Sequence, residues 1–251
     1  IFMNIAVILA GGTGTRIGAN IPKQFIKIIG KPILAYTLEV FQNNNNIDAI
    51  EVVCHPDWEN EVDRIVSEFG FTKVRWLVGG GDTFQESAMK GIFNLKNKIL
   101  DTDIVVISFG VSPMTTDDII DDNIRICKKY GNAIAAEDMV LCTCIKDDEY
   151  STTQSILRES IKGFSNPWAF RFGELYDAYD TAIKSGILDT LEPHTTSLYF
   201  ALGKRLYFSK SVSSNIKITT REDLELFEGR LLLEQKKQQT KTNINGGKND
   251  D

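Results

Sequence analysis

Residues 5–24 read Ile-Ala-Val-Ile-Leu-Ala-Gly-Gly-Thr-Gly-Thr-Arg-Ile-Gly-Ala-Asn-Ile-Pro-Lys-Gln. The apolar run from Ile5 to Ala10 is typical of a strand buried on both faces of a parallel sheet. The glycines after it predict a loop whose backbone amides can approach an anion closely, because no Cβ stands in the way. Arg16 and Lys23 add positive charge beside that loop. The stretch therefore predicts a buried strand that ends in a phosphate-binding loop.

The glycine pattern does not match the two most common phosphate loops. The dinucleotide fingerprint GxGxxG fails because Ile17 follows Gly12 and Gly14 where the third glycine belongs, and no GxxxxGK[ST] string occurs in the chain. A purely structural turn is the alternative interpretation. Two cations that converge on exposed amides repel each other unless an anion lies between them. The combination of glycines with Arg16 and Lys23 therefore favours a polyphosphate site.

Composition limits the class of protein. The chain has 251 residues, 42% of them hydrophobic and 25% charged, which fits one large α/β domain, with two small domains as the alternative. A net charge of −6 argues against a nucleic-acid partner bound through a basic face. No apolar run approaches the roughly 20 residues of a membrane span, and the start lacks a signal-peptide pattern. We expect a cytoplasmic protein with no membrane partner.

Four cysteines are present, without a CxxC motif. Cys142 and Cys144 would point to one side of an extended segment, so a metal site is conceivable there. Spacing rules favour buried thiols in a cytosolic protein instead. No zinc site is predicted.

Strand and helix patterns alternate along the chain. Apolar strands are predicted over 49–54, 74–78, 103–108 and 133–136, with amphipathic helices between them. This order implies a doubly wound, mostly parallel α/β sheet, in which ligands bind at the carboxyl ends of the strands. The first glycine loop, a second glycine cluster at 79–81 and the loop 108–113 all lie at those ends.

Later segments predict accessory features around a single domain spanning 4–231. Two extended segments, 141–146 and 152–158, indicate a hairpin arm over about 139–165, which we expect to pack on a partner subunit in a homodimer. A strand is predicted at 205–208 and an extended stretch at 215–219, and Thr220 with Asp223 resembles a capping box that starts the last helix. Residues 234–251 are predicted to form a disordered polar tail.

The ordered motifs resemble one known family. They are Leu9–Arg16, Pro22–Phe25, Gly80–Asp82 with Ser87, Asn166-Pro167 with Phe170-Arg171, and Asn215–Thr220. Together they resemble the alditol-phosphate cytidylyltransferases, which act on 2-C-methyl-D-erythritol 4-phosphate or ribitol 5-phosphate. The form that the motif takes at residues 9–16, together with residues 55–58, looks closer to the ribitol branch. The resemblance implies a Rossmann-like nucleotidyltransferase fold and transfer of CMP from CTP to a small phosphorylated polyol. Pyrophosphate would be released, with Mg²⁺ or another divalent cation as the cofactor.

The resemblance also implies roles for particular residues. Nucleotide binding falls to Leu9, Ala10, Gly11, Gly12, Thr13, Gly14, Thr15, Gly80, Gly81, Asp82 and Ser87. Charge at the reacting phosphorus would be neutralised by Arg16, Lys23 and Lys217. The acceptor would contact Ser108, Phe109, Gly110, Thr219 and, from a neighbouring subunit, Arg158. No metal ligands are assigned. The alternation itself places Lys217 opposite Ile216 and Ile218, toward a cleft or solvent.

The acceptor side departs from the family pattern. Phe109 stands where relatives usually carry an aspartate, Ser112 where they carry an arginine, and Phe84 replaces another arginine. The sequence leaves three interpretations open. The acceptor is a different phosphate monoester, or ribitol phosphate binds in a remodelled pocket, or the chain binds CTP or CDP with little catalysis. Phe109 could also simply pack against the end of the sheet.

Overall fold

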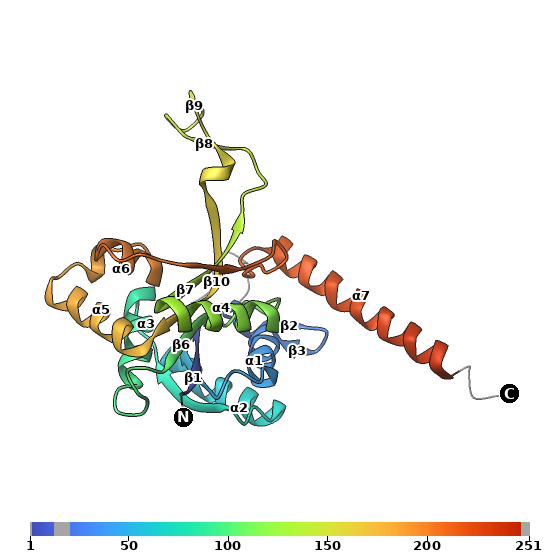
Figure 1. Cartoon of the computed structure of the whole chain (residues 1–251). Helices are drawn as coiled ribbons and strands as arrows, with labels where there is room; N and C mark the ends of the chain where they lie inside the picture. The colour runs from blue at the N-terminus through green and yellow to red at the C-terminus, as the bar shows by residue number, and fades with distance from the viewer. Residues whose placement is uncertain (1, 13–20, 247–251) are drawn as a thin grey trace.

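The computed structural model describes residues 2–12 and 21–246, and these residues build a seven-stranded central sheet in the order β11-β7-β10-β6-β1-β4-β5 (Figure 1). Its strands are β1 (Asn4–Ala10), β4 (Ala49–Cys54), β5 (Val74–Gly79), β6 (Ile104–Phe109), β7 (Asn132–Asp138), β10 (Lys162–Arg171) and β11 (Phe208–Lys210). Strands β1, β4, β5 and β6 are mutually parallel, and β11 is parallel to β7. The predicted doubly wound, mostly parallel α/β fold is confirmed.

One sheet strand was missing from the sequence-based prediction. β10 lies between β6 and β7 and runs antiparallel to both. The pattern gave no simple strand signal because polar residues and a proline interrupt the apolar residues at its centre. Trp168 and Phe170 nevertheless face the core. The expected strand 205–208 is shifted in the structure, where β11 begins only at Phe208.

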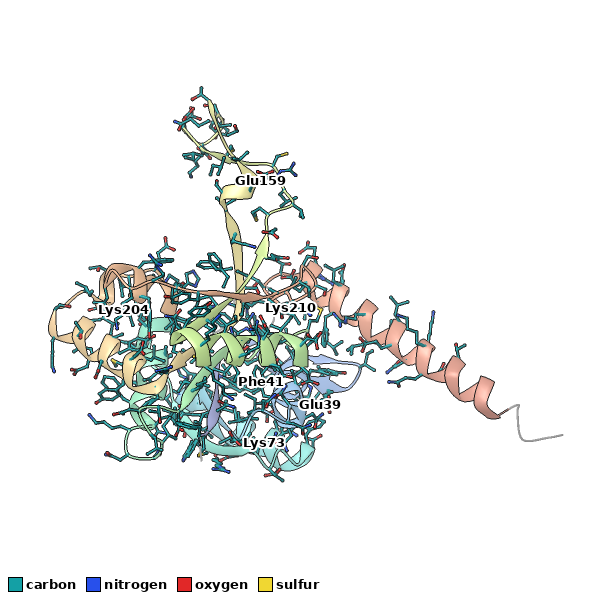
Figure 2. All side chains as sticks on the ribbon, in the orientation of Figure 1. Glu39, Phe41, Lys73, Glu159, Lys204 and Lys210 are labelled. Atoms are coloured by element: carbon teal, nitrogen blue, oxygen red, sulfur yellow. The ribbon has the colours of Figure 1, made fainter. Side chains whose placement is uncertain are left out.

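Helices cover both faces of the sheet. The helices are α1 (Ile33–Asn43), α2 (Glu59–Phe69), α3 (Phe84–Asn94), α4 (Asp117–Tyr130), α5 (Phe172–Lys184), α6 (Thr195–Ala201) and α7 (Arg221–Gly246). Alternate residues of β1 enter two separate cores: Ala6 and Ile8 pack with α1, α2 and α4, whereas Ile5 and Val7 pack with α3, α5 and α6. Side chains such as Phe41 fill the space between the layers (Figure 2). Burial on both faces explains the continuous apolar strands.

The sheet places the segments that follow β1, β5 and β6 at the carboxyl ends of parallel strands. Leu9 pairs with Val53 and with Phe109, and Cys54 pairs with Gly79. Because these strands are parallel, the segments that follow Ala10, Gly79 and Phe109 leave the sheet at the same end. That end carries the candidate site.

A hairpin arm stands clear of the sheet (Figure 1). It leaves β7 after Asp138, carries the short strands β8 (Thr143–Ile145) and β9 (Gln154–Ile156), and returns through the turn Arg158–Ser160 into β10. Residues 162–165 therefore belong to the sheet strand rather than to the arm. Cys142 and Cys144 are exposed on this arm, which corrects the expectation of buried thiols, while Cys54 and Cys127 are buried.

The last helix also corrects a prediction. Thr220 and Asp223 form the expected reciprocal cap: the Thr220 amide donates to Asp223 Oδ2 over 2.8 Å, and the Asp223 amide donates to Thr220 Oγ1 over 3.3 Å. α7 then continues to Gly246, so residues 234–246 are helical rather than a disordered tail. Glu, Gln and Lys, which fill the first part of this stretch, have high helix propensity even where they bury little surface. Among the described helices, none has the length and apolar character of a membrane span.

Candidate active site

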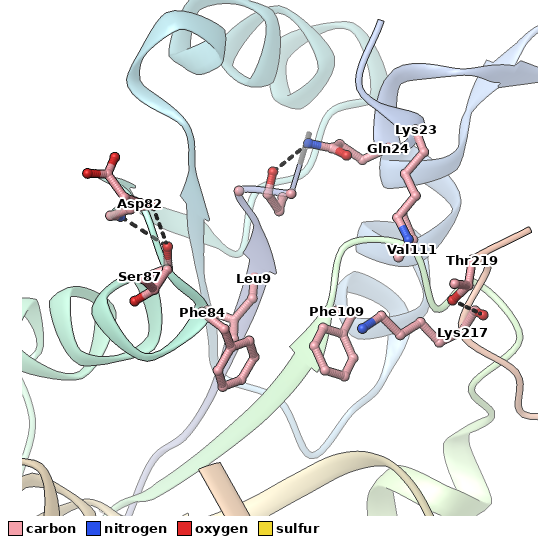
Figure 3. Close-up of a pocket in the computed structure, with 15 residues that line it drawn as sticks. Leu9, Lys23, Gln24, Asp82, Phe84, Ser87, Phe109, Val111, Lys217 and Thr219 are labelled. Atoms are coloured by element: carbon pink, nitrogen blue, oxygen red, sulfur yellow. Dashed lines mark hydrogen bonds between the residues drawn. The ribbon is translucent and has the colours of Figure 1, made fainter. Parts of the chain in front are cut away.

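A pocket of about 370 Å³ opens at the carboxyl ends of β1, β5 and β6 (Figure 3). This volume lies within the range typical of small-molecule sites. It is lined by Leu9, Ala10, Gly11, Gly12, Lys23, Gln24, Gly81, Asp82, Thr83, Phe84, Ser87, Phe109, Val111, Lys217 and Thr219. The tertiary structure thus gathers five separate segments of the chain around one cavity.

The first wall is the end of β1 and the short helix at Lys23–Phe25. Gln24 Nε2 donates to the carbonyl of Ala10 over 2.6 Å, and this bond fixes the short helix beside the glycines. Lys23 is 9% exposed, and its Nζ donates to the carbonyl of Ile218 over 2.9 Å. Lys23 therefore lines the pocket and also ties the first wall to the segment that carries Lys217.

The second wall, which adjoins the first, is the extended segment 215–219. Ile218 is fully buried, and its amide donates to the carbonyl of Val111 over 2.8 Å. Ile216 packs against the apolar cluster that contains Ile218 and Val111. Lys217 lines the pocket, as the alternation predicted. The Lys217 ammonium lies 3.6 Å from the centroid of the Phe109 ring. Thr219, a predicted acceptor residue, lines the pocket beside it.

The second glycine cluster forms the third wall. The Gly80 amide donates to the carbonyl of Cys54 over 2.6 Å, and a Cβ at Gly80 would lie 2.9 Å from Ser87 Oγ. Ser87 Oγ accepts from the Gly81 amide over 3.0 Å. Thr83 caps α3 in a capping box with Glu86. These contacts require glycine at position 80 and hold Gly81, Asp82 and Ser87 at the pocket.

Four aromatic rings meet at the base of the pocket. Phe109 packs edge-on against Trp168 at 5.5 Å between centroids and lies 5.9 Å from Phe84. The His194 ring lies 6.3 Å from Phe84 and 6.2 Å from Trp168. Two of the three positions that depart from the family pattern, Phe84 and Phe109, are therefore neighbours in space as well as pocket-lining residues.

Three predicted acceptor residues do not reach the pocket with their side chains. Ser108 is fully buried, and its hydroxyl donates to Asn166 Oδ1 over 2.7 Å. Gly110 is packed so closely that a Cβ would lie 2.9 Å from Ala10 Cβ. Arg158 is exposed on the arm, where it donates to the carbonyl of Val140 over 3.0 Å. Ser108 and Gly110 shape the strand end, and the chain does not bring Arg158 to its own pocket.

The candidate residues Thr13, Gly14, Thr15 and Arg16 lie outside the described residues. Sequence reasoning assigned no role to Gln24, Thr83 or Val111, all of which line the pocket. A signal existed for Gln24, because it directly follows Lys23 in the Pro22–Phe25 motif. Val111 acts through its backbone carbonyl, which side-chain patterns do not reveal.

The described part of the site contains lysine side chains but no preformed set of metal ligands. No group of three or more His, Cys, Asp or Glu side chains in the described part of the chain could hold a metal ion. Asp82 supplies a carboxylate at the exposed rim, and Figure 3 shows that it points away from Lys217. Mg²⁺ often binds proteins through one or two carboxylates together with substrate phosphates. These residues fit an ion that arrives bound to a nucleotide.

The thiol nearest the site is not set up as a nucleophile. Cys54 lies at the end of β4, and its carbonyl accepts from Gly80. Burial raises the pKa of this thiol to about 12, and the carboxylates of Glu59 and Asp63 add to the effect. Because the thiolate is the reactive form, Cys54 is chemically quiet at neutral pH.

Comparisons with known proteins agree on one family. The family model described as IspD: 2-C-methyl-D-erythritol 4-phosphate cytidylyltransferase matches residues 4–232. The ribitol-5-phosphate cytidylyltransferase of Lacticaseibacillus paracasei is 38% identical over 229 residues, which cover 91% of this chain and 98% of that protein. The 2-C-methyl-D-erythritol 4-phosphate cytidylyltransferase of Clostridium novyi is 35% identical over 227 residues, covering 90% and 95%.

A solved structure shows the same fold. The 4-diphosphocytidyl-2C-methyl-D-erythritol synthase of Anaerococcus prevotii aligns with a TM-score of 0.79 at 23% sequence identity. The alignment covers 92% of this chain and 96% of that one.

Proposed function

The chain belongs to the IspD family of cytidylyltransferases, and from this premise we propose that it transfers CMP from CTP to a small phosphorylated polyol and releases pyrophosphate. Ribitol 5-phosphate is the first candidate acceptor, because the relative at 38% identity carries that activity in its name. 2-C-methyl-D-erythritol 4-phosphate is the alternative. In the reaction, an acceptor phosphate oxygen forms a bond to the α-phosphorus of CTP as the bond to pyrophosphate breaks.

One observation carries the proposal: Lys23 and Lys217, from distant segments, line one pocket together with the glycines at 11, 12 and 81. Phosphoryl transfer needs positioning and charge stabilisation more than it needs a protein nucleophile. Lys23 and Lys217 would stabilise the charge on the reacting phosphates, while Gly11 and Gly12 allow phosphates to approach the main chain. Ser87 and Gly81 would hold the nucleoside end of CTP.

We also propose that Mg²⁺ enters with CTP. The ion would be held mainly by the triphosphate oxygens, with Asp82 as the carboxylate among the described residues that line the pocket. When bound, Mg²⁺ withdraws charge from the phosphates. The lysines orient the same phosphates from the protein side.

The acceptor screen is the decisive experiment. Pyrophosphate release would be measured with Mg²⁺, CTP and, in turn, ribitol 5-phosphate, 2-C-methyl-D-erythritol 4-phosphate, glycerol phosphate and sugar phosphates. We expect turnover with ribitol 5-phosphate. Binding of CTP by calorimetry without turnover on any acceptor would leave a nucleotide-binding homologue, and absence of CTP binding would remove the proposal altogether.

The arm supports a further part of the proposal, a homodimer. Val140, Leu141 and Leu157 are 76%, 69% and 67% exposed on the arm. A two-stranded hairpin is marginal alone, and clustered exposed apolar side chains are typical of interaction sites. Arg158 would then serve the acceptor phosphate of the other subunit.

Mixing two inactive variants tests this arrangement. In a dimer of Lys23→Ala with Arg158→Ala, one of the two sites receives an intact pocket and an intact arm. An equal mixture is expected to recover about a quarter of the wild-type sites after subunit exchange. A mixture of Lys23→Ala with Lys217→Ala is the matched control, because both lysines line the same pocket, and it should recover nothing. Equal behaviour of the two mixtures would contradict the shared site.

A further inference from the structure

The Lys217 side chain ends on the face of an aromatic ring. Its Nζ lies 3.6 Å from the centroid of Phe109, and Figure 3 shows the lysine extended toward that ring. Both side chains line the pocket. This distance is well inside the roughly 6 Å limit of a cation–π interaction.

The Phe109 ring packs against the side chains of Trp168 and Phe84. Trp168 is 4% exposed and packs edge-on against Phe109, with an angle of 85° between the ring planes. The indole itself is fixed, because Nε1 donates to the carbonyl of Ser165 over 2.6 Å. Phe84 contacts Phe109 from α3. The ring therefore presents a defined face to the pocket.

The backbone of Lys217 is anchored as firmly as the ring. Ile218 is fully buried, its amide donates to Val111, and its carbonyl accepts from Lys23. The lysine stem thus starts from a fixed point and ends on a fixed ring. A long flexible side chain that is ordered before substrate arrives loses less rotamer entropy when the reaction takes place.

The chemistry of the contact distinguishes it from a salt bridge. A carboxylate at position 109 would neutralise the ammonium, whereas a ring face attracts it through the quadrupole and leaves its formal charge intact. We propose that Phe109 is a positioning residue, which holds the Lys217 ammonium on its ring face so that the full positive charge meets the phosphates of the reacting nucleotide. This inference rests on the proposed function, since it assigns a task to the same site.

Substitutions at Phe109 test the contact in solution. Phe109→Leu keeps an apolar side chain but removes the ring, and it should lower kcat about 2- to 30-fold with little change in the KM for CTP. Phe109→Tyr retains the ring face and should keep most of the activity. A series with one, two and three fluorines on the Phe109 ring weakens the quadrupole at nearly constant shape, so kcat should fall in steps. In a Lys217→Ala background, Phe109→Leu should cause no further loss.

Several results would overturn the proposal. Equal losses in the Leu and Tyr variants, a flat fluorine series, or full additivity with Lys217→Ala would each assign Phe109 to packing alone. Thermal melting of every variant identifies folding defects, and the fluorine series covers the case in which Phe109→Leu does not fold.

A spectroscopic measurement separates this inference from the proposed function. In the wild type, the side-chain methylene next to the Lys217 ammonium should show an upfield ring-current shift in NMR spectra, assigned by its loss in Lys217→Ala. Phe109→Leu should abolish the shift without any substrate present. No shift in the wild type would refute the positioning role even if the enzyme is active. A clear shift in a protein with no turnover would instead count against the proposed function.

Discussion

Glu51 lies on β4, between β1 and the edge strand β5, and should make the stability of the protein fall as the pH rises. Its side chain is fully buried on β4, where Oε2 accepts from Asn94 Nδ2 over 2.6 Å and Oε1 has no hydrogen-bond partner among the described residues. Burial raises the pKa of this carboxyl from 4.5 to about 8, although the Asn94 hydrogen bond and the charge of Lys98 oppose the shift. The native protein therefore holds a proton that the unfolded chain releases.

The sign and the size of the effect follow from that difference. The native state binds more protons than the unfolded chain between pH 4.5 and about 8. The stability that protonated Glu51 contributes is therefore fully present below pH 4.5 and is lost as the pH rises through about 8. Each pH unit in this window costs about 1.4 kcal/mol, so the full loss is about 5 kcal/mol as an upper estimate. Glu51→Gln stays neutral throughout and keeps an acceptor for Asn94.

Urea denaturation at a series of pH values from 5 to 9 measures the effect. The free energy of unfolding of the wild type should fall relative to Glu51→Gln across the window, so that the variant becomes the more stable protein at high pH. Glu159→Gln, the same change on the exposed arm (Figure 2), controls for the removal of one acidic side chain. A difference between wild type and Glu51→Gln that stays constant from pH 5 to 9 would refute the reasoning.

Three further sets of substitutions test the site and the arm. Lys23→Ala and, separately, Lys217→Ala should reduce kcat by roughly 10²- to 10³-fold, as for other single electrostatic stabilisers, and near-normal turnover would contradict their roles. Gly80→Ala places a Cβ 2.9 Å from Ser87 Oγ and 3.2 Å from the carbonyl of Cys54, so calorimetry should show about 10- to 100-fold weaker CTP binding; unchanged affinity would mean that the loop adapts. Leu141→Ser combined with Leu157→Ser should convert a dimer into a monomer in light scattering, and an unchanged mass would exclude the arm as the interface.

Local sequence determined much of this protein. The run Ile5–Ala10 specified a buried parallel strand, because unbroken apolar residues require cover on both faces. Glycines at 11 and 12 and at 79–81 marked the loops beside the pocket. The alternation Ile216-Lys217-Ile218 fixed which way the lysine points, since side chains alternate along an extended chain. The family resemblance then indicated the reaction.

Only the tertiary structure decided which residues meet. The order β7-β10-β6 depends on a strand whose pattern is broken by polar residues and a proline, so pairing partners rather than propensity define β10. Ser108 was expected at the acceptor, but register turns its hydroxyl to Asn166 inside the fold. Phe109 and Lys217 are far apart in sequence, and no local pattern encodes their contact. Their 3.6 Å approach exists because β6 and the 215–219 segment end at the same pocket, a result of long-range packing.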